Sequence, residues 1–182
     1  MAATTSLSDL TGDYVLDTAR TRIGFVARHT LATRVRGRFD EFEGGARLDG
    51  DHPSRSGVRL LIRASSIRTG NPRRDDMLRG TFLATEHHPA ITFASTAVEQ
   101  VGQTHYKVTG DLGIRGVTAP VTVDIEVTGD DSDPQGNLRV ALKGGATIDR
   151  TDWGVNWNAA TGALVSPKVV LEFDLSVVRR QP

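Results

Sequence analysis

Apolar and polar residues alternate with a period of two along most of the chain, and this period is typical of β-strands with one buried face. Residues 121–128 alternate valine or isoleucine with threonine, aspartate or glutamate without a fault. Residues 33–42 place Val35, Gly37 and Phe39 on one side of a strand and three arginines on the other. One-sided strands of this kind predict an antiparallel sheet that is wet on one face and buried on the other.

Strand-like segments follow one another in a single meander with mostly short connections. They lie at residues 12–16, 21–29, 33–42, 47–49, 58–64, 90–99, 104–114, 119–128, 137–148 and 168–179. We interpret them as about eight or nine strands, a number that closes into an up-and-down barrel or stacks as a sandwich. The continuous meander favours the barrel, so the predicted fold is an all-β, extended antiparallel barrel of about eight strands.

The alternation is interrupted once, near the middle of the chain, by a segment with helical signals. Asn71 can cap a helical turn whose first position is Pro72, where the missing N–H is harmless. The turn that follows carries charges outside and Met77 and Leu78 on its inner side, and Gly80 is expected to end it. Phe82 then supplies an apolar plug. In an all-β protein a helical crossing of this kind closes one end of a barrel or lies across it, and we expect that arrangement here.

Composition limits the classes of protein that are open to the chain. With 182 residues and 19.6 kDa it suits one domain, expected over residues 11–180 after a disordered polar leader at residues 1–10. A net charge of zero provides no overall field that would draw nucleic acid or an anionic membrane surface. No apolar run is long enough to span a bilayer and the N-terminus has no signal pattern, so we expect a soluble, cytoplasmic protein.

Candidate catalytic and metal-binding chemistry is sparse. The sequence has no cysteine, phosphate-binding loop or dinucleotide glycine motif, although the sequence alone leaves a Ser/His/Asp triad open. His87 and His88 are adjacent, so in a strand they would point in opposite directions and would not share a metal ion. His29 ends a strand on its apolar face, where it is either a buried, hydrogen-bonded histidine or a polar contact at the mouth of a cavity. We therefore expect no metal, no cofactor and no catalytic residue.

Two further groups each fit both a structural and a ligand-binding interpretation. Arg73, Arg74 and Arg79 on the helical crossing would form surface ion pairs, or would contact the anionic head group of an amphiphile, which suits the guanidinium fork. Trp153 follows a strand and lies either in the core or beside a cavity, where it would contact a ligand chain. Both pairs of alternatives stay open at this point.

Seven segments occur in a characteristic order along the chain. They are Asp17 with IGFVARH (residues 23–29), RVRGRFDEFEG (34–44), SIRTG (66–70), RRDDMLRGTF (73–82), HPAITFAS (88–95), YKVTGDLGIRGVTAPV (106–121) and IDRTDWGV (148–155). This ordered set, which spans residues 12–178 with the closing strand, resembles the YceI-like family of lipid- and polyisoprenoid-binding proteins. Met77 departs from the family pattern, which often has histidine at that position.

The resemblance implies a lipocalin-like barrel whose apolar interior holds the tail of a long-chain amphiphile, such as a polyisoprenoid, an isoprenoid quinone or a fatty acid derivative. It implies binding, transport or storage of that ligand and not chemistry, with no nucleic acid partner and no membrane insertion. A monomer and a homodimer both stay open. From strand alternation we expect His29 and Arg74 at the head group and the other contacts along the tail. The expected ligand contacts are Phe25, Ala27, His29, Phe39, Ile62, Arg74, Met77, Phe82, Phe93, Ile114, Val123, Trp153 and Phe173.

Two other functions also stay open on the sequence alone. One is a protein-binding module with a filled barrel, which would use the outer face of the sheet. The other is a barrel enzyme that acts on a lipid, with His29 and an acidic neighbour as its acid–base pair.

Overall fold

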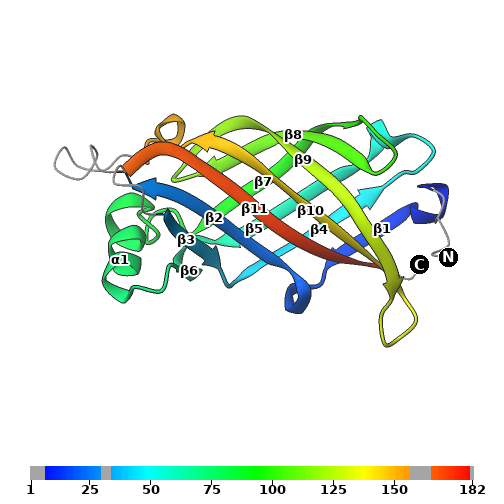
Figure 1. Ribbon diagram of the computed structural model, residues 1–182, viewed down its shortest axis with the longest axis horizontal. Coiled ribbons are helices and arrows are strands. Elements are labelled where there is room, and N and C mark those ends of the chain that lie inside the picture. The colour runs from blue at the N-terminus through cyan, green and yellow to red at the C-terminus, as the bar shows by residue number, and fades with distance from the viewer. Residues whose placement is uncertain (1–6, 30–33, 156–164, 181–182) are drawn as a thin grey trace.

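The structure is a computed structural model that describes residues 7–29, 34–155 and 165–180, with the backbone alone at residues 7, 8, 29 and 165. Its strands wrap into one elongated barrel with α1 at one end and the start of β1 at the other (Figure 1). The strands are β1 (Gly12–Leu16), β2 (Arg22–His29), β3 (Arg34–Phe39), β4 (Phe42–Leu48), β5 (Gly57–Arg63), β6 (Ile67–Arg68), β7 (Ala90–Gln100), β8 (His105–Ile114), β9 (Val117–Ser132), β10 (Leu138–Asp149) and β11 (Val165–Arg179). The helical segments are η1 (Leu7–Leu10), η2 (Thr18–Arg20), η3 (Pro53–Arg55), η4 (Ala64–Ser66), α1 (Pro72–Met77), η5 (Leu78–Phe82) and η6 (Arg150–Trp153). Among the described residues, no helix combines the length and the apolar character needed to cross a bilayer.

Eight strand positions close the barrel by antiparallel pairing throughout. The hydrogen-bonded order is β1-β4-β5-β7-β8-β9-β10-β11, and β11 pairs with β1 to complete the circle. The same wall continues beside β11 with β2, β3 and β6. Three pairs of consecutive strands therefore each act as one strand with a bend, and these pairs are β1 with β2, β3 with β4 and β5 with β6. This meander confirms the all-β, eight-stranded barrel predicted from the alternation.

One predicted strand proves to be two. The sequence predicts a single strand over residues 33–42, whereas the structure breaks it at Asp40 between β3 and β4. The wall bends there, because β3 pairs with β2 and briefly with β6 while β4 pairs with β1 and β5. At this bend Asp40 forms ion pairs with Arg38 at 2.9 Å and with Arg68 at 2.7 Å. The bend depends on partners distant in sequence, so local alternation gives no sign of it.

The chain joins the barrel earlier than the sequence predicts. Residues 1–10 are expected to form a disordered leader, yet residues 7–10 form the turn η1, and Leu10 is only 6% exposed. The hydroxyl of Tyr14 donates a hydrogen bond of 2.7 Å to the Leu10 carbonyl and holds this turn against β1. The structure corrects the expectation for residues 7–10, and residues 1–6 lie outside the described residues.

The two tyrosines of the chain are expected to lose their phenolic protons at a higher pH than free tyrosine. Burial raises the pKa of Tyr14, which Arg179 partly opposes, and burial also raises the pKa of Tyr106. A group whose pKa is higher in the folded state stabilises the fold below its unfolded pKa, here about 10, and this stabilisation is lost as the pH rises through the folded pKa. We therefore expect the free energy of unfolding to fall above about pH 10, less so in Tyr14→Phe. Equal phenolate absorbance midpoints for native and denatured protein would contradict this.

The helical crossing begins as predicted but ends later. Asn71 Oδ1 accepts a hydrogen bond of 3.1 Å from the backbone N–H three residues on, so Asn71 is the N-cap of α1. Gly80 does not end the helix, because the π-helical turn η5 continues through Phe82. The continuation buries Leu78 and Phe82, which are four residues apart and therefore share a helical face. Met77, expected on the inner side, contributes to the interior cavity but is also 42% exposed.

Candidate ligand-binding site

A continuous cavity of about 340 Å³ occupies the interior of the barrel, a volume within the range of small-molecule sites. Every second residue of β11 from Val169 to Val177 lines it, and eight residue steps of about 3.3 Å make this wall about 26 Å long. Leu171 and Phe173 point inward but are only half-buried, because they face open space. Val140 is the largest described side chain with less than 2% exposure. The barrel is therefore hollow.

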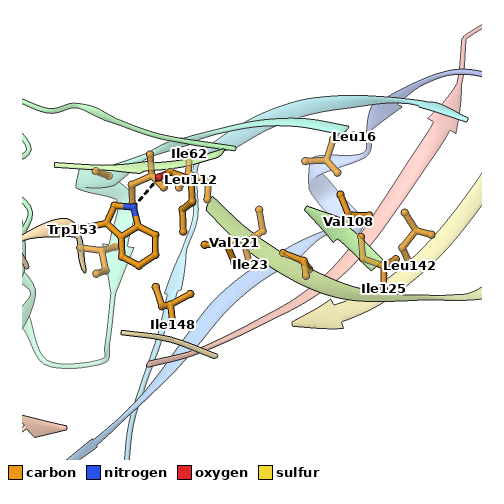
Figure 2. Close-up of a cluster of buried hydrophobic side chains, with 14 of the residues drawn as sticks. Leu16, Ile23, Ile62, Val108, Leu112, Val121, Ile125, Leu142, Ile148 and Trp153 are labelled. Carbon is orange, nitrogen blue, oxygen red and sulfur yellow. Dashed lines mark hydrogen bonds between the residues drawn. The ribbon is translucent and has the colours of Figure 1, made fainter. Parts of the chain in front are cut away.

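The cavity lining is almost entirely apolar, and strands from all round the barrel contribute to it. Figure 2 shows some of the lining side chains, such as Ile23, Val121 and Leu142. The described lining residues are aliphatic, aromatic, methionine or glycine, except for Arg59, Arg74 and Arg150. Arg59 is exposed and lies between the inward-pointing Val58 and Leu60, so its side chain belongs to the outer face of β5. No histidine, carboxylate or hydroxyl side chain lines the described part of the cavity. Within the described ranges, no three His, Cys, Asp or Glu residues gather into a metal site.

One end of the cavity is polar because α1 contributes Arg74. The Arg74 guanidinium is half-buried, and it donates hydrogen bonds from Nε to Thr69 Oγ1 at 2.8 Å and from Nη2 to the Thr69 carbonyl at 2.9 Å. Thr69 in turn donates from its hydroxyl to Asp75 Oδ1 at 2.6 Å. The Nη1 group of Arg74 forms no hydrogen bond with any described residue. Arg74 is therefore held in place by two bonds and keeps donors for a ligand.

The same end carries a second arginine, since Figure 1 places η6 and α1 at one end of the barrel. Arg150 is 7% exposed, and it donates from Nη1 to the Val155 carbonyl at 2.7 Å and from Nε to the Ser166 carbonyl at 3.2 Å. Burial lowers the pKa of Arg150, and Asp149 opposes the shift. The guanidinium nevertheless stays charged in proteins. Two cations thus line the α1 end of an otherwise apolar cavity.

The opposite end of the cavity is apolar. Leu16 of β1, Leu142 of β10 and Val177 of β11 line it, and no described charged side chain joins them. Leu10 and Val140 belong to the same buried cluster. The cavity therefore has a direction, with cations at the α1 end and hydrocarbon at the end where β1 begins.

Glycines let two of the cavity phenylalanines lie along the wall. Phe25 is directly opposite Gly37 in the register of β2 and β3, and Phe173 is directly opposite Gly144 in that of β10 and β11. A Cβ on Gly37 would overlap the ring of Phe25, and one on Gly144 would lie 2.9 Å from Cε2 of Phe173. The ring of Phe25 thus occupies the space that a side chain at position 37 would fill, whereas a Cβ on Gly144 would meet the backbone carbonyl of Asp124 before the ring of Phe173. This arrangement leaves the axis of the barrel open.

The structure brings most of the expected ligand contacts together. Those that line the cavity are Phe25, Ala27, Phe39, Ile62, Arg74, Met77, Phe82, Phe93, Ile114, Val123 and Phe173. His29 is the last residue of β2, opposite Val165 of β11, but its side chain lies outside the described residues. The placement follows the predicted strand faces, while contact with a ligand stays a prediction for each of these residues.

Trp153 does not line the cavity, which corrects the expectation that it contacts a ligand chain. Its indole is 2% exposed, and Nε1 donates a hydrogen bond of 2.7 Å to the Leu112 carbonyl (Figure 2). The side chain therefore fixes η6 to β8. Arg150 is the residue that the sequence argument missed. It stands two positions after Ile148, which also lines the cavity, so continued alternation along β10 would have found it.

A closed meander of eight strands around an apolar cavity with one polar end defines the class of β-barrels that enclose a ligand-sized space. Within that class the chain belongs to the YceI-like domain family, whose model matches residues 14–177.

Curated relatives and solved structures agree with this assignment. The chain is 31% identical over 149 residues to a UPF0312 protein of Azotobacter vinelandii, covering 80% of this chain and 78% of the relative. It is 36% identical over 134 residues to a UPF0312 protein of Pseudomonas aeruginosa, covering 73% and 70%. BcnA of Burkholderia cenocepacia has a TM-score of 0.80 at 23% identity, covering 88% of this chain and 98% of BcnA. A polyisoprenoid binding domain from Saccharophagus degradans has a TM-score of 0.72 at 19% identity, covering 92% and 98%. At these identities the solved structures show a shared fold.

Proposed function

We propose that this protein is a non-enzymatic carrier or store for a long-chain amphiphile, such as a polyisoprenoid, an isoprenoid quinone or a fatty acid derivative. The observation that carries the proposal is the continuous apolar cavity with cations at one end alone. The tail would lie along the barrel axis and the head group would meet Arg74 and Arg150. The structural neighbour from Saccharophagus degradans, described as a polyisoprenoid binding domain, supports this class of ligand.

Energetics favour a long tail over a short one. Each buried methylene contributes about 0.8 kcal/mol, while ordering the ligand costs at least about 4 kcal/mol. A dissociation constant of about 1 μM corresponds to about 8 kcal/mol. About fifteen buried methylenes are therefore needed to reach micromolar affinity from the tail alone. The wall of about 26 Å is consistent with a tail of such length.

The two other functions suggested by the sequence have less support. A protein-binding module with a filled barrel does not fit a cavity of about 340 Å³. A lipid-acting enzyme would need an acid–base pair of His29, whose side chain lies outside the described residues, with a carboxylate, and the described cavity lining offers no carboxylate. The carrier is the function that fits the site best.

The direct test is to purify the protein from its own host without detergent and analyse an organic extract by mass spectrometry. A single long-chain species close to one per protein, or per dimer, would support the carrier and name its ligand. A lipid-free protein that also takes up no added polyprenyl, quinone or fatty acid ligand would contradict it.

Replacing Arg74 with glutamine is expected to weaken binding of an amphiphile with an anionic head group by about tenfold to a hundredfold, since hydrogen bonds to charged groups are the stronger kind. Binding of the uncharged alcohol with the same tail should change by less than about threefold. Displacement of an apolar fluorescent probe measures both affinities. Arg73→Gln is the matched control, because Arg73 is exposed on the same helix and does not line the cavity. Equal losses for acid and alcohol would show that Arg74 does not meet the head group.

A further inference from the structure

The α1 end of the barrel exposes a group of cations, although the chain as a whole is uncharged and Asp76 and Asp152 are exposed at the same end. Arg28 and Arg34 stand directly opposite each other in the register of β2 and β3, and both are exposed. Arg73 of α1 and Lys168 near the start of β11 are also exposed. Figure 1 shows the end of β2 and the start of β11 at the same end of the barrel as α1. We call Arg28, Arg34, Arg73 and Lys168 the basic rim.

The basic rim has few acidic partners among the described residues, where only Lys168 stands opposite a carboxylate, that of Asp149. Within the part of the chain that the structure describes, Arg28, Arg34 and Arg73 form no ion pair, whereas Arg36 on the same face is paired with Glu172 at 3.4 Å. Like charges directly opposite each other on neighbouring strands destabilise a sheet. An anionic surface placed against the rim would relieve that repulsion.

The far end of the barrel carries a cluster of aspartates as well as the exposed Arg47 and Arg55. Asp130, Asp131 and Asp133 gather where β9 turns into β10, and of these Asp131 is paired with Arg139 at 2.6 Å. A negatively charged surface therefore attracts the unpaired arginines of the basic rim and repels the aspartate cluster, which favours approach with the α1 end first.

The rim lies beside the place where the cavity reaches the surface. Met77 both lines the cavity and is 42% exposed. It follows Arg73 by four residues, so the two side chains share one face of α1. An exposed apolar side chain next to unpaired cations matches the interfacial layer of a bilayer, where anionic head groups lie above hydrocarbon.

We propose that the basic rim docks the α1 end of the barrel on an anionic membrane surface, with the opening of the cavity toward the lipid. This inference rests on the proposed function, because a ligand with a long apolar tail resides in membranes and must be exchanged there. The docking is peripheral and needs no inserted segment. An acidic protein would match the charge of the rim but not the exposed Met77 at the cavity opening.

Flotation with vesicles of phosphatidylcholine plus phosphatidylglycerol, compared with phosphatidylcholine alone, tests the docking. Each arginine near an anionic surface contributes about fivefold to the partition coefficient, so Arg28→Gln/Arg34→Gln should lower partition by roughly 25-fold. Raising the salt from about 0.1 M to about 1 M shortens the screening length from about 10 Å to about 3 Å and should release the wild-type protein. The matched control, Arg47→Gln/Arg55→Gln, removes two exposed arginines near the far end and should change partition by less than about twofold.

Uptake of an apolar fluorescent probe without vesicles separates docking from cargo binding. Uptake should be equal in wild-type protein and in Arg28→Gln/Arg34→Gln, since neither side chain lines the cavity. A wild-type protein that floats with anionic vesicles but takes up no probe would overturn the carrier and leave the docking standing. Equal flotation with neutral and anionic vesicles, or equal losses in the rim and control variants, would overturn the docking. Absence of flotation together with binding to a soluble polyanion would assign the rim to an acidic macromolecule instead.

Discussion

Gly37→Ala is expected to weaken binding of a long apolar ligand by about 5- to 150-fold, the equivalent of the 1 to 3 kcal/mol that overpacking costs. The added Cβ would overlap the ring of Phe25, and the three atoms nearest to it all belong to that ring. The backbone can therefore stay in place while the ring turns toward the barrel axis. There it would occupy space that the ligand tail needs. Titration with an apolar fluorescent probe, or with the extracted ligand, measures the loss.

The stability of the same variant should change little, which distinguishes a blocked cavity from a damaged fold. The displaced ring moves into open space, and alanine is intrinsically better than glycine in a strand by about 0.5 to 1 kcal/mol. Gly129→Ala is the matched control, because nothing lies within 4 Å of a Cβ at that position. In a Phe25→Ala background, Gly37→Ala should have no further effect on binding. A loss that persists in that background would contradict the mechanism.

The sequence predicted the wall of the barrel because each strand carries its own evidence of which face is inside. A slip of one residue along residues 121–128 would place threonine and acidic side chains in the cavity. The alternation is therefore compatible with only one assignment of the inward face. Closure of the barrel is different. It depends on Val15 meeting Val178 across nearly the whole chain, and no local pattern encodes such a pairing. The eight-stranded barrel was inferred from strand number and meander order, and the structure confirms it.

The sequence predicted those parts of the candidate site that follow the alternation of inward and outward residues along a strand. It did not predict the parts that depend on which residues of different strands lie next to each other. Phe173 and Val123 occupy inward positions of regular strands, and both line the cavity. That the cavity is open depends on Gly37 lying opposite Phe25, a fact of register that no single strand reveals. Trp153 stands at the end of regular structure, where alternation stops. Its large ring suggested a ligand contact, and the structure shows a packing role instead.

Trp153→Ala is expected to lower the free energy of unfolding by about 3 to 5 kcal/mol, the usual cost of truncating a large buried aromatic side chain. For a chain of this size each kcal/mol corresponds to about 2 to 4 °C in melting temperature, so thermal denaturation should show a fall of about 10 °C. The loss has two sources. The indole belongs to the same buried cluster as Ile62, Leu112 and Ile148, and its Nε1–H satisfies the carbonyl of Leu112 at 2.7 Å (Figure 2).

Trp153→Phe separates these sources, because it keeps most of the ring and removes the N–H donor. It should cost about 1 to 3 kcal/mol, the penalty for leaving a buried acceptor unpaired. Both variants should also weaken binding of an anionic amphiphile, since η6 positions Arg150 at the polar end of the cavity. The uncharged alcohol of the same tail should bind Trp153→Phe almost normally, because its tail contacts lie elsewhere. If Trp153→Phe lost affinity for acid and alcohol equally with its stability intact, Trp153 would be a ligand contact after all.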